Sequence, residues 1–145
     1  MPIDFPNQHI ADMVAADRAA EWLTVQPVSI RTGAATVELT VAEHMCNGHG
    51  TCHGGVLFTL ADIALSYASN SVGALNVAAH ADIQYVTPAQ LGQRLRATAT
   101  ERMRYGRSGR NGIYDIPVTV ADTGELVAIF TGRVVQVAQR SERGS

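Results

Sequence analysis

Apolar and polar positions alternate along the chain with two different periods. From Asn7 to Trp22 the apolar residues recur at helical spacings, which predicts an amphipathic N-terminal helix. Period-two alternation then predicts two strands, Val25–Arg31 and Ala35–Val41, joined at Thr32-Gly33. After Gly73 this pattern returns and predicts four further strands, at Val77–Val86, Arg94–Met103, Gly112–Val120 and Leu126–Ala138.

A long apolar segment separates the two groups of strands. Val56–Ser71 contains neither Pro nor Gly and is long enough for about four helical turns, so it predicts a helix. Nearly every side chain from Val56 to Ala68 is apolar, which is typical of a helix inside a protein. Because the strands come in runs and do not alternate with helices, the order predicts one antiparallel α+β domain over residues 1–145.

Asp62 is the one charged residue in this apolar helix. The spacing of Thr59, Asp62 and Ser66 puts them on one stripe, together with Gly55 and Asn70. An ionised carboxylate in apolar surroundings is costly unless it is paired or its pKa moves, and such carboxylates concentrate at active sites. Asp62 is therefore a candidate catalytic group; the alternative is that it pairs with an arginine or reaches water.

Gly54-Gly55 stands where this helix begins. The first amides of a helix have no internal acceptor, and a glycine has no Cβ to hold a substrate carbonyl away. The amide of Gly54 or Gly55 is therefore a candidate oxyanion donor. The alternative is a tight turn that needs glycine for its dihedral angles.

Gly54 and Asp62 cannot both touch one carbonyl group within a single chain. Eight residues along a helix separate them by roughly 12 Å. Two such helices packed antiparallel about a two-fold axis, roughly 8–10 Å apart, would bring Gly54 of one chain beside Asp62 of the other. The spacing therefore predicts two shared sites at a homodimer interface.

Other chemistries fit the sequence less well. The histidines and cysteines between residues 44 and 53 lack the paired spacing of a zinc site, so no metal is expected. Cys52 and His53 are chain neighbours whose side chains should diverge, which argues against a cysteine nucleophile. The segment Gly106-Arg-Ser-Gly-Arg110 lacks the final glycine of a serine-hydrolase elbow.

Composition narrows the class of protein further. The formal net charge of −2 argues against a nucleic-acid partner. No apolar run reaches the roughly 18 residues of a membrane span, and no secretory signal is visible. The two cysteines suggest no disulfide framework, so a reducing, cytoplasmic location is expected.

One stretch of the chain resembles a known family. The pattern Asn47-x5-His53-Gly-Gly-x6-Asp62, with the later Gly112-Ile-Tyr-Asp-Ile, resembles the phenylacetic acid degradation (PaaI-type) thioesterases of the hotdog fold. The resemblance extends from about the first helix to the last strand. It implies an antiparallel sheet wrapped around the long central helix, dimers that pair into tetramers, and hydrolysis of aryl-acetyl-CoA thioesters. No cofactor is expected, because the coenzyme A thioester is the substrate.

The resemblance also implies roles for individual residues. Asp62 would serve as general base or nucleophile, and the Gly54 amide would polarise the thioester carbonyl. Asn47 and His53 would orient substrate or water beside it. Ser66 matches a hydroxyl that some related hotdog thioesterases use to hold the water.

Arginines suggest where coenzyme A lies. Six of the eleven basic residues fall between residues 94 and 110, and by strand parity Arg94, Arg96, Arg102 and Arg104 should share one face. Arg107 and Arg110 flank glycines in a connection, where amides and guanidinium groups can bind phosphate. We expect the nucleotide end of coenzyme A to contact Arg107, Arg110, Asn111 and Gly112.

Two other functions on the same fold are alternatives. A hotdog dehydratase would rely on a His-x-x-Gly-x-Pro type motif, which the sequence lacks. A non-catalytic acyl-CoA-binding module acting as a sensor would normally carry a DNA-binding helix-turn-helix, for which we expect no room. Hydrolysis of a thioester therefore remains the favoured function.

Overall fold

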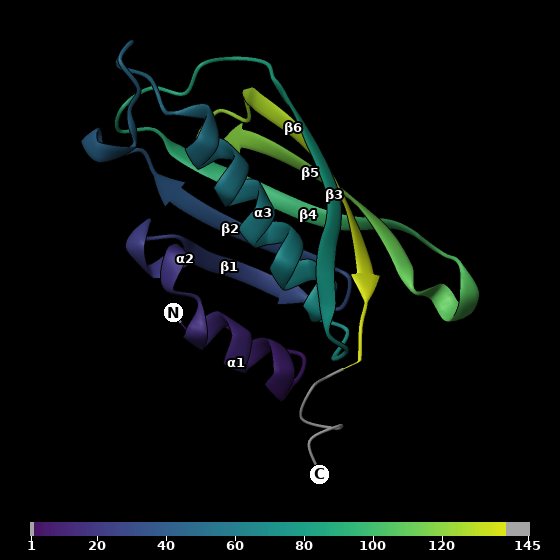
Figure 1. Ribbon diagram of the computed structural model, residues 1–145. Coiled ribbons are helices and arrows are strands. Elements are labelled where there is room, and N and C mark those ends of the chain that lie inside the picture. Colours follow the sequence, from purple (N-terminus) through teal and green to yellow (C-terminus); the bar gives the residue numbers. More distant parts are fainter. Residues whose placement is uncertain (1, 139–145) are drawn as a thin grey trace.

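A computed structural model describes residues 2–138 as one sheet with helices on one side of it (Figure 1). In chain order the elements are α1 (Gln8–Ala16), α2 (Arg18–Trp22), β1 (Gln26–Arg31), β2 (Ala34–Thr40), η1 (Glu43–Met45), α3 (Gly54–Asn70), β3 (Asn76–Tyr85), β4 (Arg94–Tyr105), η2 (Arg107–Gly109), β5 (Asn111–Val120) and β6 (Leu126–Gln136).

The sheet has the strand order β1-β2-β4-β5-β6-β3, and every neighbouring pair is antiparallel. Figure 1 shows α3 lying across one face of this sheet, with α1 and α2 beside it. The connection between β4 and β5, which contains η2, projects beyond the rest of the molecule. This arrangement confirms the expected α+β architecture of an antiparallel sheet around one long central helix.

The N-terminal helix is not continuous, contrary to the prediction of one helix over residues 7–22. It is divided at Asp17, whose backbone is extended, with φ −80° and ψ 93°. The Asp17 carboxylate accepts a hydrogen bond from the amide of Ala20 at 3.0 Å and so caps α2. Aspartate favours such a cap over a helix interior, and helical periodicity continues through the break.

Small side chains on the sheet allow α3 to lie close to it. Ala97 and Ala99 of β4 are fully buried on the face that α3 covers. On β6, a Cβ added to Gly132 would lie 2.5 Å from the Leu65 side chain of α3, closer than atoms can approach. Leu65 thus packs directly on the backbone of β6, and α3 lies close against the sheet.

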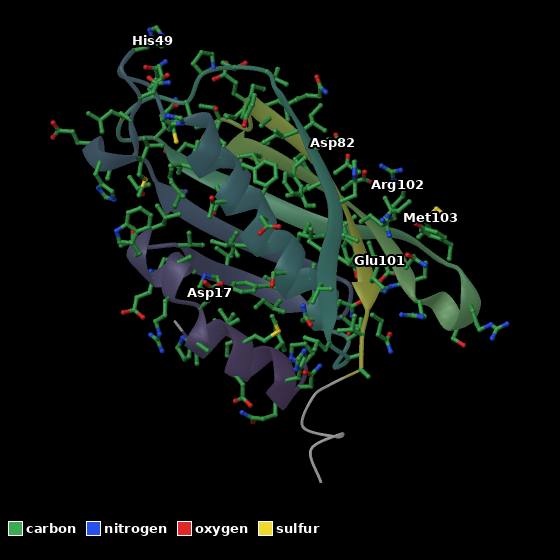
Figure 2. All side chains as sticks on the ribbon, in the orientation of Figure 1. Asp17, His49, Asp82, Glu101, Arg102 and Met103 are labelled. Carbon is green, nitrogen blue, oxygen red and sulfur yellow. The ribbon has the colours of Figure 1, made fainter. Side chains whose placement is uncertain are left out.

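A β-bulge in β4 changes the face on which Arg104 lies. The pairing of β4 with β5 shifts register between Glu101 and Met103. Arg102 and Met103 are therefore both exposed on the outer side, and Figure 2 shows them together, apart from Glu101. The prediction that Arg104 shares the outer face of Arg94 is wrong, because the inserted residue turns Arg104 inward.

β3 forms an open edge of the sheet. It pairs only with β6, and most of its side chains are exposed. Such an edge offers unpaired backbone groups to another strand. Among residues 2–138, no helix has the length and apolar character needed to cross a bilayer.

Candidate active site

The uncovered side of α3 carries the polar stripe that the sequence predicted. Asp62 and Ser66 are half-buried, whereas most of their neighbours on α3 are buried. Thr59 donates from its hydroxyl to the carbonyl of Gly55 at 2.8 Å, so its side chain is engaged within the helix. Asn70 is fully buried and so does not belong to the accessible part of the stripe. Its side-chain oxygen accepts a hydrogen bond from the backbone N–H of Asn76 at 2.9 Å.

The carboxylate of Asp62 has no hydrogen-bond or ion-pair partner among residues 2–138. Burial is the larger cause that raises its pKa above the usual range, and the negative charge of Asp17 is the second. Asp17 lies at the junction of α1 and α2 (Figure 2) and accepts a hydrogen bond from the Tyr67 hydroxyl of α3 at 3.0 Å. In the described chain no arginine neutralises Asp62, so it is a poorly solvated carboxylate, as a general base should be.

Asp62 faces a cavity of about 290 Å³ between α1, α3 and β3, which we call the Asp62 cavity. Polar groups are few in it: beside Asp62 they come from Ser66, Ser69 and Asn76. The rest of the lining is apolar and consists of Met13, Leu65, Leu75, Val77, Ala78 and Val134. A mostly apolar cavity with one carboxylate in its wall is the kind of site that binds a compact, apolar ligand group.

The N-terminus of α3 begins at Gly54, with His53 as its cap. The His53 ring nitrogen Nδ1 accepts from the amide of Gly55 at 3.4 Å, so His53 holds the second amide of the helix. No acceptor among residues 2–138 engages the Gly54 amide. Neither glycine has a positive φ, so glycine is not required here for a turn. Among the described residues the Gly54 amide is therefore an unused donor at the start of α3, and its role as oxyanion donor stays a prediction.

Tyr85 gives a physical reason for glycine at residue 54. Its hydroxyl donates to the Gly54 carbonyl at 3.1 Å, and a Cβ on Gly54 would lie 3.0 Å from the tyrosine ring. Tyr85 ends β3, 31 residues later in the chain, and it is 56% exposed. In the sequence, Tyr85 fits the alternating pattern of a strand and shows nothing more. The sequence therefore offered no signal for the contact between Tyr85 and Gly54.

Asn47 organises the loop before the helix. Its side-chain oxygen accepts from the backbone amides of His49 at 2.9 Å and Thr51 at 3.2 Å. With Gly54, Tyr85 and Leu57 it lines a second hollow, of about 340 Å³, which we call the Gly54 cleft. Its Nδ2 group donates to the Thr51 hydroxyl at 3.1 Å. Asn47 therefore stabilises the loop beside the Gly54 amide. Its predicted role, to orient substrate or water there, stays a prediction.

The Gly54 cleft and the Asp62 cavity share no lining residue. Asn47 and Gly54 belong to the first, and Asp62 and Ser66 belong to the second. The two groups that one thioester carbonyl needs are thus presented at separate places along α3. This separation is what the helical spacing predicted for a single chain.

The residues expected at the nucleotide end of coenzyme A lie at the β4–β5 connection. Arg107 and Arg110 are exposed there. Asn111 accepts a hydrogen bond from Arg133 at 3.1 Å. Gly112 is buried directly beneath the Arg104 guanidinium, which a Cβ would approach to 2.9 Å. Across residues 2–138, no three His, Cys, Asp or Glu side chains are gathered in a way that could hold a metal ion.

Comparison with known proteins identifies the family. Residues 49–109 match the family model described as the thioesterase superfamily. The chain is 39% identical over 126 residues to the acyl-coenzyme A thioesterase PaaI of Escherichia coli strain K12. The aligned region covers 87% of this chain and 87% of the relative. The chain belongs to the thioesterase superfamily.

Solved structures agree with this family and with the hotdog fold. The E. coli PaaI structure superposes with a TM-score of 0.84 at 37% identity, covering 90% of this chain and 92% of that one. A hypothetical thioesterase from Streptococcus pneumoniae, solved with coenzyme A, superposes with a TM-score of 0.73 at 26% identity, covering 80% and 90%. The hotdog fold and the PaaI-like relationship of this thioesterase-superfamily member are confirmed.

Proposed function

We propose that this chain is an acyl-CoA thioesterase that hydrolyses aryl-acetyl-CoA thioesters such as phenylacetyl-CoA or hydroxyphenylacetyl-CoA. The observation that carries the proposal is Asp62, a carboxylate of raised pKa that faces a mostly apolar cavity and has no hydrogen-bond or ion-pair partner within the described part of the chain. The chain's similarity to an acyl-coenzyme A thioesterase supports the class of reaction. The small apolar volume beside Asp62 supports a compact acyl group over a long one.

The proposed reaction adds water across the thioester bond. The Gly54 amide donates a hydrogen bond to the carbonyl oxygen as negative charge develops on it. Asp62 either removes a proton from the attacking water, with Ser66 beside it, or attacks the carbonyl carbon itself to form an anhydride that water then opens. The C–S bond breaks, the coenzyme A thiolate takes up a proton, and the carboxylic acid is released.

A single turnover in ¹⁸O-labelled water tests the nucleophilic role of Asp62. If Asp62 is the nucleophile and water opens the anhydride at the Asp62 carbonyl, ¹⁸O remains in the protein and is detected by mass spectrometry of the Asp62 peptide. Label in the released acid alone is expected of a general base, or of an anhydride opened at the acyl carbonyl.

The site is proposed to form twice in a homodimer, with a further pairing of dimers. Gly54 and Asp62 line different hollows of one chain and are eight residues apart along α3, roughly 12 Å, which supports a site that takes the two groups from two chains. The exposed edge strand β3, which runs between Asn76 of the Asp62 cavity and Tyr85 of the Gly54 cleft, offers a surface for the second chain.

Replacing Asp62 by asparagine tests the proposed activity. We expect Asp62→Asn to lower kcat by about 10²-fold or more, because an acid–base group is lost. The rate is measured by separating coenzyme A from phenylacetyl-CoA by chromatography. The variant should unfold at the same temperature as the wild type or above it at neutral pH, since a raised carboxyl pKa means that ionisation of Asp62 opposes folding once the pH exceeds the unfolded value of 3.8.

Equal rates in wild type and Asp62→Asn would contradict the role of Asp62. Binding of phenylacetyl-CoA by the wild type without turnover would instead indicate a non-catalytic binding module. A lower unfolding temperature of the variant would assign Asp62 a structural role.

Arg110→Ala tests the proposed contact with coenzyme A. We expect KM for phenylacetyl-CoA to rise about 10-fold with little change in kcat, because an exposed arginine that binds a phosphate contributes to binding and not to the chemical step. Arg18→Ala is the matched control, since Arg18 is an exposed arginine on α2 paired with Glu21. If KM in Arg110→Ala equals that of the control, the assignment is wrong.

A further inference from the structure

The loop that leads into the Gly54 cleft is a small hairpin closed by two cysteines. Cys46 and Cys52 are antiparallel bridge partners, directly opposite each other. Between them, the Asn47 amide donates to the Thr51 carbonyl at 2.8 Å, and outside them the His53 amide donates to the Met45 carbonyl at 2.8 Å. The hydrogen bonds therefore flank the cysteines, which form a non-hydrogen-bonded pair.

This kind of pair brings side chains unusually close. Directly opposed residues of a non-hydrogen-bonded pair have Cα atoms about 4.5 Å apart with their side chains on the same face. Disulfides span Cα separations of about 4.4–6.8 Å. Burial is the larger cause that raises the pKa of the Cys52 thiol to about 11, and the charge of a nearby Cys46 thiolate is the second, as expected of neighbouring thiols. The backbone of the hairpin thus already has the separation that a disulfide needs.

Both thiols are free and only weakly held. The Cys46 sulfur donates to the Ala42 carbonyl at 3.6 Å, and the Cys52 sulfur donates to the His53 carbonyl at 3.8 Å. A thiol is a weak hydrogen-bond donor, so either contact can be given up at small cost. Cys46 is half-buried and Cys52 is 5% exposed, so an external reagent reaches Cys46 first.

We propose that Cys46 and Cys52 are a site of reversible disulfide formation that lowers the activity of the adjoining Gly54 cleft. The oxidant is a low-molecular-weight disulfide. The Cys46 thiolate attacks one of its sulfurs and expels the first thiolate, which leaves a mixed disulfide on Cys46. The Cys52 thiolate then attacks the Cys46 sulfur and expels the second. Two electrons pass to the small disulfide, and the two cysteine protons end on the two released thiols.

The pair is adjacent to the proposed oxyanion donor. Cys52 lines the Gly54 cleft and precedes His53, the residue that caps α3. Disulfide formation turns the Cys52 sulfur away from the His53 carbonyl and toward Cys46. Because small displacements of catalytic groups are costly, we expect a loss of kcat/KM on the order of ten-fold. The rate effect rests on the proposed thioesterase activity, whereas disulfide formation does not.

Equilibration of the purified protein with reduced and oxidised glutathione tests the proposal. The chain has only two cysteines, so peptide mapping after alkylation shows unambiguously whether Cys46 and Cys52 are linked. We expect oxidising buffer to give a monomer-mass chain lighter by two hydrogen atoms, with Cys46 linked to Cys52, and dithiothreitol to reverse it. Cys52→Ser should retain glutathione on Cys46, whereas Cys46→Ser should take up little.

Activity is followed in parallel by the chromatographic assay, because a disulfide-based thiol reagent would itself oxidise the pair. Wild type should lose activity with oxidation and regain it with dithiothreitol, whereas Cys46→Ser should keep the same rate in both buffers. Two thiols that remain open to alkylation, a disulfide between chains, or an internal disulfide with an unchanged rate would each overturn the proposal. If the reduced protein hydrolyses no thioester, mapping alone decides whether the cysteines pair.

Discussion

At the scale of single residues, the chemistry of Asp62 depends on a residue that the sequence did not connect with it. Asp17 lies 45 positions earlier and reaches α3 through the Tyr67 hydroxyl, at 3.0 Å. Its negative charge adds to burial in raising the pKa of Asp62. The carboxylate is thereby kept a stronger base than an ordinary aspartate, and this can be tested through the pH dependence of the rate.

If Asp62 acts as proposed, its ionised form is the active one, and its raised pKa should place the acidic limb of kcat/KM above the usual pKa of aspartate. Asp17→Asn removes the neighbouring charge, so we expect the limb to move to lower pH. Asparagine keeps an oxygen that accepts from the Ala20 amide, and its NH2 group can donate to the Tyr67 hydroxyl where the second oxygen of Asp17 accepted from it, so the fold should persist. Since burial is the larger cause, the limb should stay above the ordinary value.

The matched control is Asp12→Asn. Asp12 is on α1 and receives an exposed hydrogen bond from Gln8, so its replacement removes the same charge from an exposed position that has no hydrogen bond to α3 among the described residues. An acidic limb that moves equally in both variants, or in neither, would contradict the proposed coupling between Asp17 and Asp62.

Residue chemistry was predictable where it depended on helical spacing. The stripe of Thr59, Asp62 and Ser66 could be found from the sequence because α3 is regular. The contact of Tyr85 with Gly54 and the pairing of Cys46 with Cys52 could not be found from the sequence, because each depends on how separate segments of the chain pack together. For the cysteines, the spacing of six residues gained meaning only once the hairpin between them was known.

At the scale of elements, periodicity located every strand to within about two residues but missed local irregularities. The break at Asp17 and the bulge at Arg102 both escaped, because each changes the backbone without interrupting the apolar pattern. The bulge has the larger consequence. It places Arg104 against Tyr114, at 3.0 Å, and Asn76, at 3.1 Å, so that a guanidinium links β4 and β5 to the floor of the Asp62 cavity.

Arg104→Ala should lower the free energy of unfolding by roughly 1–3 kcal/mol, because Asn76 and Tyr114 would lose a donor in a largely buried site. Arg102→Ala is a matched control two residues away. Arg102 pairs with Asp115 on the exposed outer face, where solvent screens the ion pair, so its loss should destabilise the protein clearly less than the loss of Arg104. Urea unfolding of the two variants measures the difference, and equal destabilisation would mean that the inward turn of Arg104 has no energetic consequence.

At the scale of the whole molecule, one chain presents the proposed catalytic groups in two separate hollows. The Gly54 cleft and the Asp62 cavity open at different places along α3, and the open edge β3 extends between them. Homodimer formation would supply to each cleft the carboxylate of the other chain. Light scattering should therefore give a mass of at least two chains, and mixing of two defective variants can show whether a site is shared.

Asp62→Asn and Gly54→Val should each be nearly inactive as pure proteins. If one site takes Gly54 from one chain and Asp62 from the other, a heterodimer of the two variants contains one site with both groups intact. Unfolding the variants together and refolding them at equal amounts should then restore about a quarter of the wild-type rate, since half of the dimers are mixed and each has one working site of two. If both groups act within one chain, every site in the mixture carries a defect and no activity returns. The same mixture without prior unfolding is the control, because intact dimers should not exchange chains within the assay.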